Sequence, residues 1–200
     1  ISEDAVEIAR LSLWIKTVRS DKPLTALDGN IRVGDSLISD SAVSEHAFQW
    51  DDKFAAPFDV IVGNPPYDVL SEAETGLTDV EVRKAWFKTH PVFEHATGGK
   101  QNLYKLFACQ MIHKLAPGGR LALICPMPIL GDVQATNVRK FLFERCAIQS
   151  VDAFPQKDNA ERRVFRDAKL STCIITARQG AGDVDVPMRV RVHPANQFET

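Results

Sequence analysis

The sequence predicts an α/β protein built on a doubly wound sheet. Helical and strand-like segments alternate along its 200 residues, and 44% of them are hydrophobic, which is enough to bury one sizeable core. An apolar, β-branched run over residues 58–62 stops abruptly at a turn with two prolines, as expected for a buried strand. Ligands of such sheets bind beyond the carboxyl ends of the strands. Residues that directly follow predicted strands are therefore the first candidates for a functional site.

The first segment is predicted to be an amphipathic helix. Ser2 is a typical N-cap, and the acidic Glu3 and Asp4 follow it in the first turn, where they favour the helix. Apolar residues then recur at helical spacing, namely Ala5, Ile8, Leu11, Ile15 and Val18.

Strands and helices then alternate to the end of the chain. We expect a short strand over residues 31–33 that ends at Gly34 and Asp35, and a strand buried on both faces over residues 58–62. Residues 36–53 have only a weak helical pattern, and residues 68–99 resemble an insertion. The remaining predicted elements are helices over 102–115 and 133–145, strands over 120–125, 148–154 and 172–177, and a β-rich stretch over 186–192.

Composition favours a cytoplasmic protein and excludes several other classes. No apolar run approaches the roughly 20 residues that cross a bilayer, and the acidic start lacks the basic residues of a secretory signal. The four cysteines contain no C-x-x-C pair, so buried free thiols are expected rather than disulfides or a metal site. We therefore predict no membrane segment and no metal.

The net charge of −2 conceals an asymmetry between the two parts of the chain. Residues 1–80 contain 6 basic and 15 acidic side chains, whereas residues 81–200 contain 18 and 11. A basic part suits a polyanionic partner such as DNA, although a solvated surface has the same composition.

The tetrapeptide Asn64-Pro65-Pro66-Tyr67 directly follows the predicted strand over residues 58–62. An exocyclic amino group of a purine is a poor nucleophile because its lone pair is delocalised into the ring. The Asn64 side-chain oxygen and the Pro65 carbonyl oxygen can accept hydrogen bonds from its two N–H groups and so localise the lone pair on nitrogen. The prolines hold the turn rigid, and Tyr67 offers a face on which a flipped base can stack. The alternative is a rigid turn without chemistry.

Together with six further blocks, this motif resembles the N(6)-adenine DNA methyltransferases of the gamma class, found in fused type II (type IIG) restriction-modification enzymes. In the family's order, the blocks are residues 1–17, 31–37, 64–67, 102–107, 117–121, 154–157 and 168–173. The resemblance implies a Rossmann-like class I methyltransferase fold and S-adenosylmethionine as cofactor. It also implies double-stranded DNA with a flipped adenine as substrate, and nuclease and recognition regions that are fused or separate.

The resemblance also implies roles for three further residues. Asp35 would accept a hydrogen bond from the cofactor's adenine, Phe107 would pack near that adenine, and Phe154 would line the pocket of the target base. A turn carboxylate and two core aromatic residues are the structural alternatives. The basic side chains of the segment 157–169 could contact phosphates or form an ordinary charged loop.

Two parts of the family's cofactor site are not found in the sequence: the glycine-rich turn after the first strand and the acidic residue after the second. The resemblance therefore implies a catalytic domain over residues 1–178 that is incomplete at its N-terminus by two strands and the glycine loop. A β-rich extension over residues 179–200 follows. The expected activity is that of the parent enzyme, and tight cofactor binding by these residues alone is not expected.

Three alternative functions remain open. The same tetrapeptide occurs in enzymes that methylate a glutamine amide of a protein or an RNA base. The stretch from Gly34 to Leu37 spells the nucleophile block of the GDSL serine hydrolases, with Ser36 as nucleophile, but no histidine follows an aspartate by three residues. A methyltransferase fold that only binds DNA is the third alternative.

Overall fold

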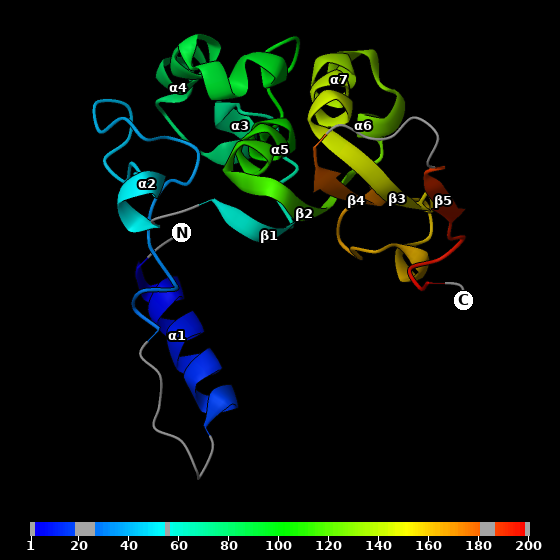
Figure 1. Ribbon diagram of the computed structural model, residues 1–200, viewed down its shortest axis with the longest axis horizontal. Helices are drawn as coiled ribbons and strands as arrows, with labels where there is room; N and C mark the ends of the chain where they lie inside the picture. The colour runs from blue at the N-terminus through cyan, green and yellow to red at the C-terminus, as the bar shows by residue number, and fades with distance from the viewer. Residues whose placement is uncertain (1–2, 19–26, 55–56, 181–186, 199–200) are drawn as a thin grey trace. The chain divides into compact units, whose positions relative to one another are not determined.

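The computed structural model describes residues 3–18, 27–54, 57–180 and 187–198 (Figure 1). The chain divides into two compact units, Ile1–Phe54 and Ala55–Thr200.

The first unit begins with the predicted helix. Helix α1 spans Glu3–Thr17, with Glu3 and Asp4 in its first turn. The expected cap, Ser2, lies outside the described residues. Val6 is the buried residue of this helix. All five apolar side chains predicted at helical spacing are exposed instead: Ala5, Ile8, Leu11, Ile15 and Val18.

The strand predicted over residues 31–33 is wrong. No strand occurs among the described residues of the first unit, so this segment has no neighbouring strand with which to form a ladder of hydrogen bonds. An isolated bridge between Asp35 and Ala47 follows it. The short helix α2, Trp50–Lys53, ends the unit, and Trp50 packs edge-on against Phe48 with ring centroids 5.1 Å apart.

The second unit contains a mixed five-stranded sheet in the order β1-β2-β4-β3-β5. Its strands are β1 Phe58–Gly63, β2 Leu115–Pro126, β3 Cys146–Phe154, β4 Thr172–Gln179 and β5 Arg189–Val192. Among the described strands, β4 alone runs antiparallel to its neighbours. All of these strands were predicted, although Val186, the expected start of the last, lies outside the described residues. The α/β class is confirmed.

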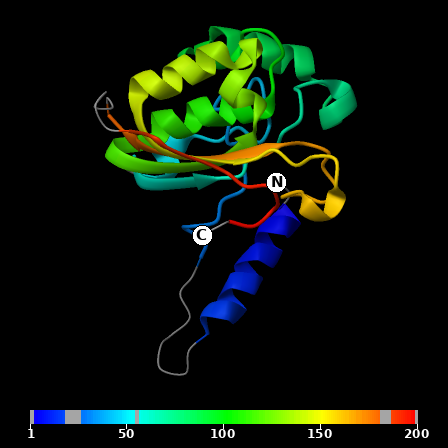
Figure 2. The same ribbon diagram turned by 90° about the vertical axis from the view of Figure 1, so that its right-hand side faces the viewer.

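Helices cover one face of this sheet (Figure 2). Helix α5, Leu103–Lys114, packs on β2, and α7, Thr136–Arg145, packs on β3. Both were predicted. The shorter helical segments are α3 Glu72–Thr75, α4 Val80–Thr89, η1 Pro91–Ala96, α6 Pro128–Gly131, η2 Val133–Ala135 and η3 Ala160–Arg162. Because η1 packs against α4, α5 and α7, the expected insertion over 68–99 contributes to the core.

The strand over residues 58–62 is not buried on both faces. Strand β1 lies at the end of the described sheet, where Val60 is 61% and Val62 77% exposed. Ile61, on the face that helices cover, pairs with the buried Leu121. The apolar composition of β1 therefore corresponds to burial on one face only.

Two expectations from composition can be compared with the structure. All four cysteines are free and buried, as predicted: Cys109, Cys125, Cys146 and Cys173. No helix within the described ranges is long and apolar enough to cross a membrane.

Gly119 is required where β1 and β2 meet. A Cβ at this position would lie 2.8 Å from the Ala116 carbonyl oxygen, 3.0 Å from that of Phe58 and 3.1 Å from that of Asp59. Backbone atoms cannot yield as a flexible side chain does.

We expect Gly119→Ala to lower the free energy of unfolding by about 1–3 kcal/mol, because the new methyl group forces the β1–β2 pairing apart. Thermal and urea unfolding measure this. Gly131→Ala is the matched control, since nothing lies within 4 Å of its added Cβ. Equal stability of the two variants would contradict the steric argument.

Candidate active site at the carboxyl edge of the sheet

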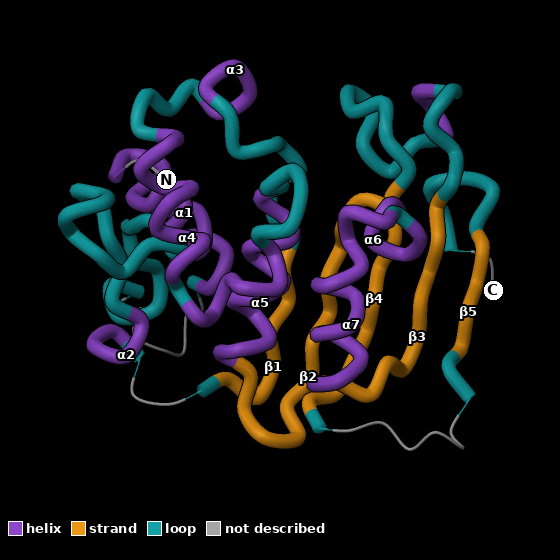
Figure 3. Tube along the Cα trace, turned by 90° about the horizontal axis from the view of Figure 1, so that it is seen from above, coloured by secondary structure: helices purple, strands orange, loops and turns teal. Residues whose placement is uncertain are grey.

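The carboxyl ends of four strands meet at one edge of the sheet. Strands β1, β2, β3 and β5 run parallel, and the antiparallel β4 begins at the same edge, where the connecting loops gather (Figure 3). Asn64 follows β1, Phe154 ends β3, Thr172 begins β4 and His193 follows β5. Residues far apart in the sequence thus share the edge at which α/β sheets bind ligands.

The tetrapeptide lies where the sequence predicts, directly after β1. Gly63, the last residue of β1, pairs with Leu123 of β2, which anchors the start of the motif. Asn64 is exposed, and its side chain has no hydrogen-bond partner among the described residues. Pro65 is buried and Pro66 exposed. The Asn64 amide is therefore available to a ligand while the backbone beside it is held in place.

Tyr67 is half-buried, and its phenol oxygen is completely covered. The Oη atom has no hydrogen-bond partner within the described part of the chain. Burial raises the pKa of Tyr67 above its ordinary value, and the nearby Cys125 and Cys173 add to the effect, so the phenol stays neutral. The ring of Phe165 meets the Tyr67 ring edge-on, with centroids 5.8 Å apart and planes at 74°.

The segment after Tyr67 is tied to the start of α5. Leu103 donates its backbone N–H to the Asp68 carbonyl at 2.9 Å, and Leu70 donates to the Gln101 carbonyl at 2.8 Å. Gln101 is 5% exposed, yet neither its amide nitrogen nor its amide oxygen has a partner among the described residues. The buried Thr172 hydroxyl also has no hydrogen-bond partner among the described residues. Buried polar atoms without partners are rare and are often satisfied by a ligand or water. Sequence reasoning assigned a role to neither residue, because Gln101 directly precedes the block 102–107 and Thr172 is one of several residues of the block 168–173.

A buried lysine fixes the loop before Gln101. Lys105 of α5 is 1% exposed, and its ammonium group donates to the carbonyl oxygens of Lys100, Gly98 and Gln134. Burial lowers its pKa. Since its hydrogen bonds go to backbone carbonyls of the loop and of η2, Lys105 holds residues 98–100 and η2 against α5.

Phe154 is placed at the expected edge, but its ring is 4% exposed. The ring stacks on His193, with centroids 4.8 Å apart and planes at 19°, and meets Phe198 edge-on at 5.5 Å. Its predicted role in a base pocket remains a proposal.

Asp152, two residues before Phe154, is the buried centre of a polar cluster with the partly exposed Arg191 and the buried His193. Its carboxylate accepts hydrogen bonds from Arg191 Nε at 2.6 Å and Nη2 at 2.8 Å, and it lies 2.8 Å from His193 Nε2. The Arg191 guanidinium beside Asp152, with a smaller contribution from His193, holds the pKa of that carboxyl below its usual range. The cluster thus ties β5 to β3 behind Phe154.

The two expected cofactor residues lie in different units. Phe107 is a half-buried residue of α5 whose neighbours Leu106 and Ala108 are in the core. Asp35 lies in the first unit, where its Oδ1 accepts from the Leu37 N–H at 3.2 Å and its backbone N–H donates to the His46 carbonyl. Asp35 is therefore a turn carboxylate in local terms, and the cofactor role remains a proposal.

The hydrolase arrangement is not formed by the described residues. The Ser36 carbonyl accepts from Trp50 Nε1 at 2.9 Å, but no histidine nitrogen lies within hydrogen-bond distance of the Ser36 hydroxyl in the described ranges. Nor do three or more metal-ligating side chains cluster among those residues.

Comparison with known proteins gives one family. The model of the Eco57I restriction-modification methylases matches residues 1–160. The type II restriction enzyme and methyltransferase RM.Eco57I of Escherichia coli is 31% identical over 168 residues, which are 80% of this chain and 15% of that protein.

Two solved structures share the fold. The DrdV–DNA complex has a TM-score of 0.67 and 16% identity, over 98% of this chain and 21% of DrdV. A Listeria monocytogenes protein solved as a class I S-adenosylmethionine-dependent methyltransferase has a TM-score of 0.50 and 19% identity, over 72% of this chain and 39% of that one. The predicted class I methyltransferase fold is confirmed, and the chain spans well under half the length of these proteins.

The Asp152 cluster predicts a dependence of stability on pH. We expect Asp152→Asn to lower the free energy of unfolding at pH 7 by about 1.5–3 kcal/mol, because charge-assisted hydrogen bonds are removed. The pKa of Asp152 is depressed in the folded state, so its contribution is present above the unfolded pKa of about 4 and disappears as the pH falls through the folded pKa. The difference from wild type should shrink accordingly.

Urea unfolding at pH 7, 5 and 3.5 measures this difference. Asp167→Asn removes an exposed carboxylate of the same unit and is the control. A difference between wild type and Asp152→Asn that stays constant down to pH 3.5 would show that the carboxylate charge contributes nothing.

Proposed function

Since the chain belongs to the Eco57I restriction-modification methylase family, we propose that it supplies catalytic residues that transfer a methyl group from S-adenosylmethionine to the 6-amino group of adenine in double-stranded DNA. The observation that carries the proposal is the exposed Asn64 amide after β1, which has no partner among the described residues and lies between the anchored Gly63 and the buried Pro65. The activity belongs to the full-length protein, as part of a restriction-modification system in the cytoplasm.

In the proposed reaction, the tetrapeptide activates the amino group. The Asn64 side-chain oxygen and the Pro65 carbonyl oxygen accept hydrogen bonds from the two N–H groups of the adenine amino group. The lone pair of the amino nitrogen is then localised on that nitrogen. Pro65 and Pro66 have restricted φ angles and no N–H donors, which keeps both acceptors aimed before the substrate arrives. No reorganisation of the turn is then needed as the reaction proceeds.

The target base would be held by aromatic side chains. Tyr67 stacks on the flipped adenine, and its phenol is neutral and partly fixed by Phe165. Phe154 lines another side of the pocket for the base, and its ring stacks on that of His193. The amide of Gln101 and the hydroxyl of Thr172, which lack partners within the described part of the chain, are suited to hydrogen bonds with a polar ligand.

S-adenosylmethionine supplies an activated methyl group when bound. Phe107 fits its adenine ring because it is an aromatic side chain, half accessible, on a helix anchored in the core. Asp35 would accept a hydrogen bond from the adenine amino group. We further propose that residues 1–178 belong to the catalytic domain, to which residues 179–200 add β5.

We expect Asn64→Ala to lower the turnover number of the full-length protein about 100-fold or more, because it removes an acceptor used in the transition state. Affinity for S-adenosylmethionine should stay nearly unchanged. The assay measures labelled methyl transfer to DNA, with nucleoside analysis for 6-methyladenine.

Gln149→Ala, which removes another exposed amide from β3, is the control for this assay. Near-normal turnover of Asn64→Ala would contradict the assigned role. Label in protein or RNA instead of DNA would favour the alternative acceptors.

For the cofactor, we expect Asp35→Ala to weaken binding of S-adenosylmethionine about 10-fold or more, since a charge-assisted hydrogen bond is removed. Equilibrium binding and the apparent KM measure this. Asp40→Ala is a close control because Asp40 also accepts a backbone N–H two residues ahead, that of Ala42 at 2.8 Å. Equal effects of both variants would indicate that Asp35 only supports its turn.

A further inference from the structure

The segment of residues 155–171, here called the β3–β4 loop, joins two strands at the candidate site. Its two ends are tied together, because the Ser171 hydroxyl donates to the Pro155 carbonyl at 2.7 Å. Ser171 also accepts, through its carbonyl, the Met127 N–H that follows β2. The loop therefore leaves the carboxyl edge of the sheet from a closed base.

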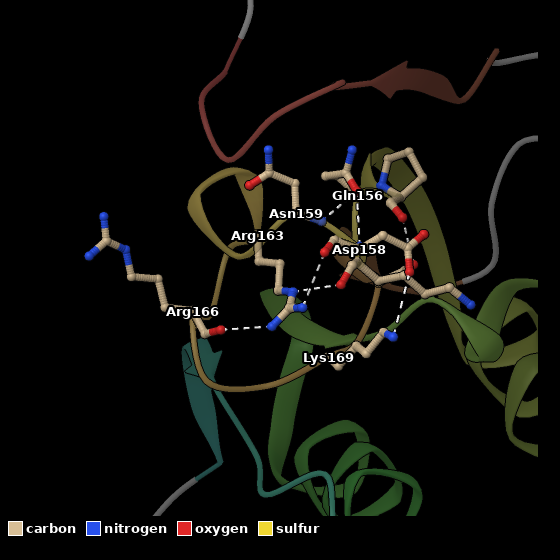
Figure 4. A network of polar contacts seen from close by, with 9 residues as sticks. Gln156, Asp158, Asn159, Arg163, Arg166 and Lys169 are labelled. Carbon is tan, nitrogen blue, oxygen red and sulfur yellow. Dashed lines mark hydrogen bonds and ion pairs between the residues drawn. The ribbon is translucent and has the colours of Figure 1, made fainter.

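Arg163 organises the interior of the β3–β4 loop (Figure 4). Its guanidinium donates Nε to the Lys157 carbonyl at 2.5 Å, Nη1 to the Arg166 carbonyl at 2.9 Å and Nη2 to the Asp158 carbonyl at 3.5 Å. Arginine suits this task because its planar group presents several donors in fixed directions. Arg163 thus links the two halves of the loop, and its donors are occupied by backbone.

Other cations of the loop face solvent. Lys157, Arg162 and Arg166 are exposed, and among the described residues the guanidinium groups of Arg162 and Arg166 have no hydrogen-bond or ion-pair partner. Figure 4 shows the Arg166 side chain extending away from the network around Arg163. Lys169 differs, since its Nζ lies 3.9 Å from Asp158 Oδ1 and forms an ion pair with that carboxylate. Exposed guanidinium groups are well suited to bind phosphates.

Phe165, between Arg163 and Arg166, faces the candidate site. It is half-buried and meets the Tyr67 ring edge-on at 5.8 Å. Three neighbouring positions therefore have three different environments: Arg163 contacts the loop's own backbone, Phe165 contacts Tyr67, and Arg166 contacts solvent.

We propose that the β3–β4 loop binds the DNA backbone and positions Tyr67. Arg162 and Arg166 bind phosphates, Arg163 keeps the loop in one shape, and Phe165 transmits that shape to the Tyr67 ring. Phe165 is a positioning residue, since it acts through Tyr67. This inference rests on the proposed DNA methylation and adds a second group of residues to it.

Phosphate binding by the loop is tested by the salt dependence of DNA binding by the full-length protein. Fluorescence anisotropy with duplex DNA at several salt concentrations gives the slope of log K against log salt, whose magnitude is about 0.9 for each phosphate that the protein neutralises. The double variant Arg162→Ala/Arg166→Ala should therefore show a slope smaller in magnitude by about 1.8. Arg189→Ala removes one exposed arginine at the start of β5 and should change the slope little. A wild-type slope in the double variant overturns phosphate binding by these two arginines.

The positioning role is tested with 2-aminopurine. The adenine that wild-type protein methylates is first mapped and then replaced by 2-aminopurine, whose fluorescence rises when the base leaves the stack. Phe165→Ala should lower both this signal and turnover several-fold while the salt slope stays that of wild type. Phe165→Tyr, which keeps the ring, should restore both. An unchanged signal and turnover in Phe165→Ala overturn the positioning role.

Arg163→Ala tests whether the β3–β4 loop acts as one unit or whether its side chains act independently. Because Arg163 holds the whole loop, its removal should lower the salt slope, the 2-aminopurine signal and turnover together. Wild-type methylation combined with wild-type behaviour of all loop variants would refute the inference and leave the proposed function intact. If wild-type protein transfers no methyl group to DNA, the proposed function fails, and the salt slopes alone decide whether the loop binds phosphates.

Discussion

The parallel pairing of β1 with β2 is the constraint on which the candidate site depends. The register of this pairing determines where β1 ends in the sheet, and hence the position of Asn64 relative to the ends of β2 and β3. The pairing requires a close approach of backbones near Phe58, which only a residue without a side chain at position 119 permits. A glycine far from the motif in sequence therefore helps to place the motif in space.

The polar side chains near the site are of two kinds: some are bound by partners within the protein, and others have no such partner in the described part of the chain and can bind a ligand. Lys105, Arg163 and Asp152 are charged, but their partners are backbone carbonyls or neighbouring ions, so they shape loops and strands. Asn64 and the Gln101 amide are uncharged and lack partners among the described residues. For the planar amino group of a base, neutral acceptors such as Asn64 are suitable, because hydrogen bonds can be accepted without a competing charge.

Local patterns predicted most elements of the fold, and long-range contacts account for what they missed. Helices α5 and α7 and the strands of the sheet followed from periodicity, and the tetrapeptide followed from its place after a strand. The exposure of Val60 and Val62 did not, since burial of a strand's side chains depends on what covers each face of the sheet. The contact between Phe165 and Tyr67 joins residues nearly a hundred positions apart. Asp152 is 39 and 41 positions from its partners Arg191 and His193, so neither arrangement could be predicted from spacing.

The place of β1 at the end of the described sheet also affects how the protein behaves at high concentration. Among the described residues, β1 is the end strand of its sheet and has two exposed valines, and such an end strand is a template for another strand. Natural sheets protect such strands with charges, prolines or a covering segment. Where nothing covers β1, copies of the molecule are expected to aggregate strand to strand, so solubility reports directly on whether this edge is occupied.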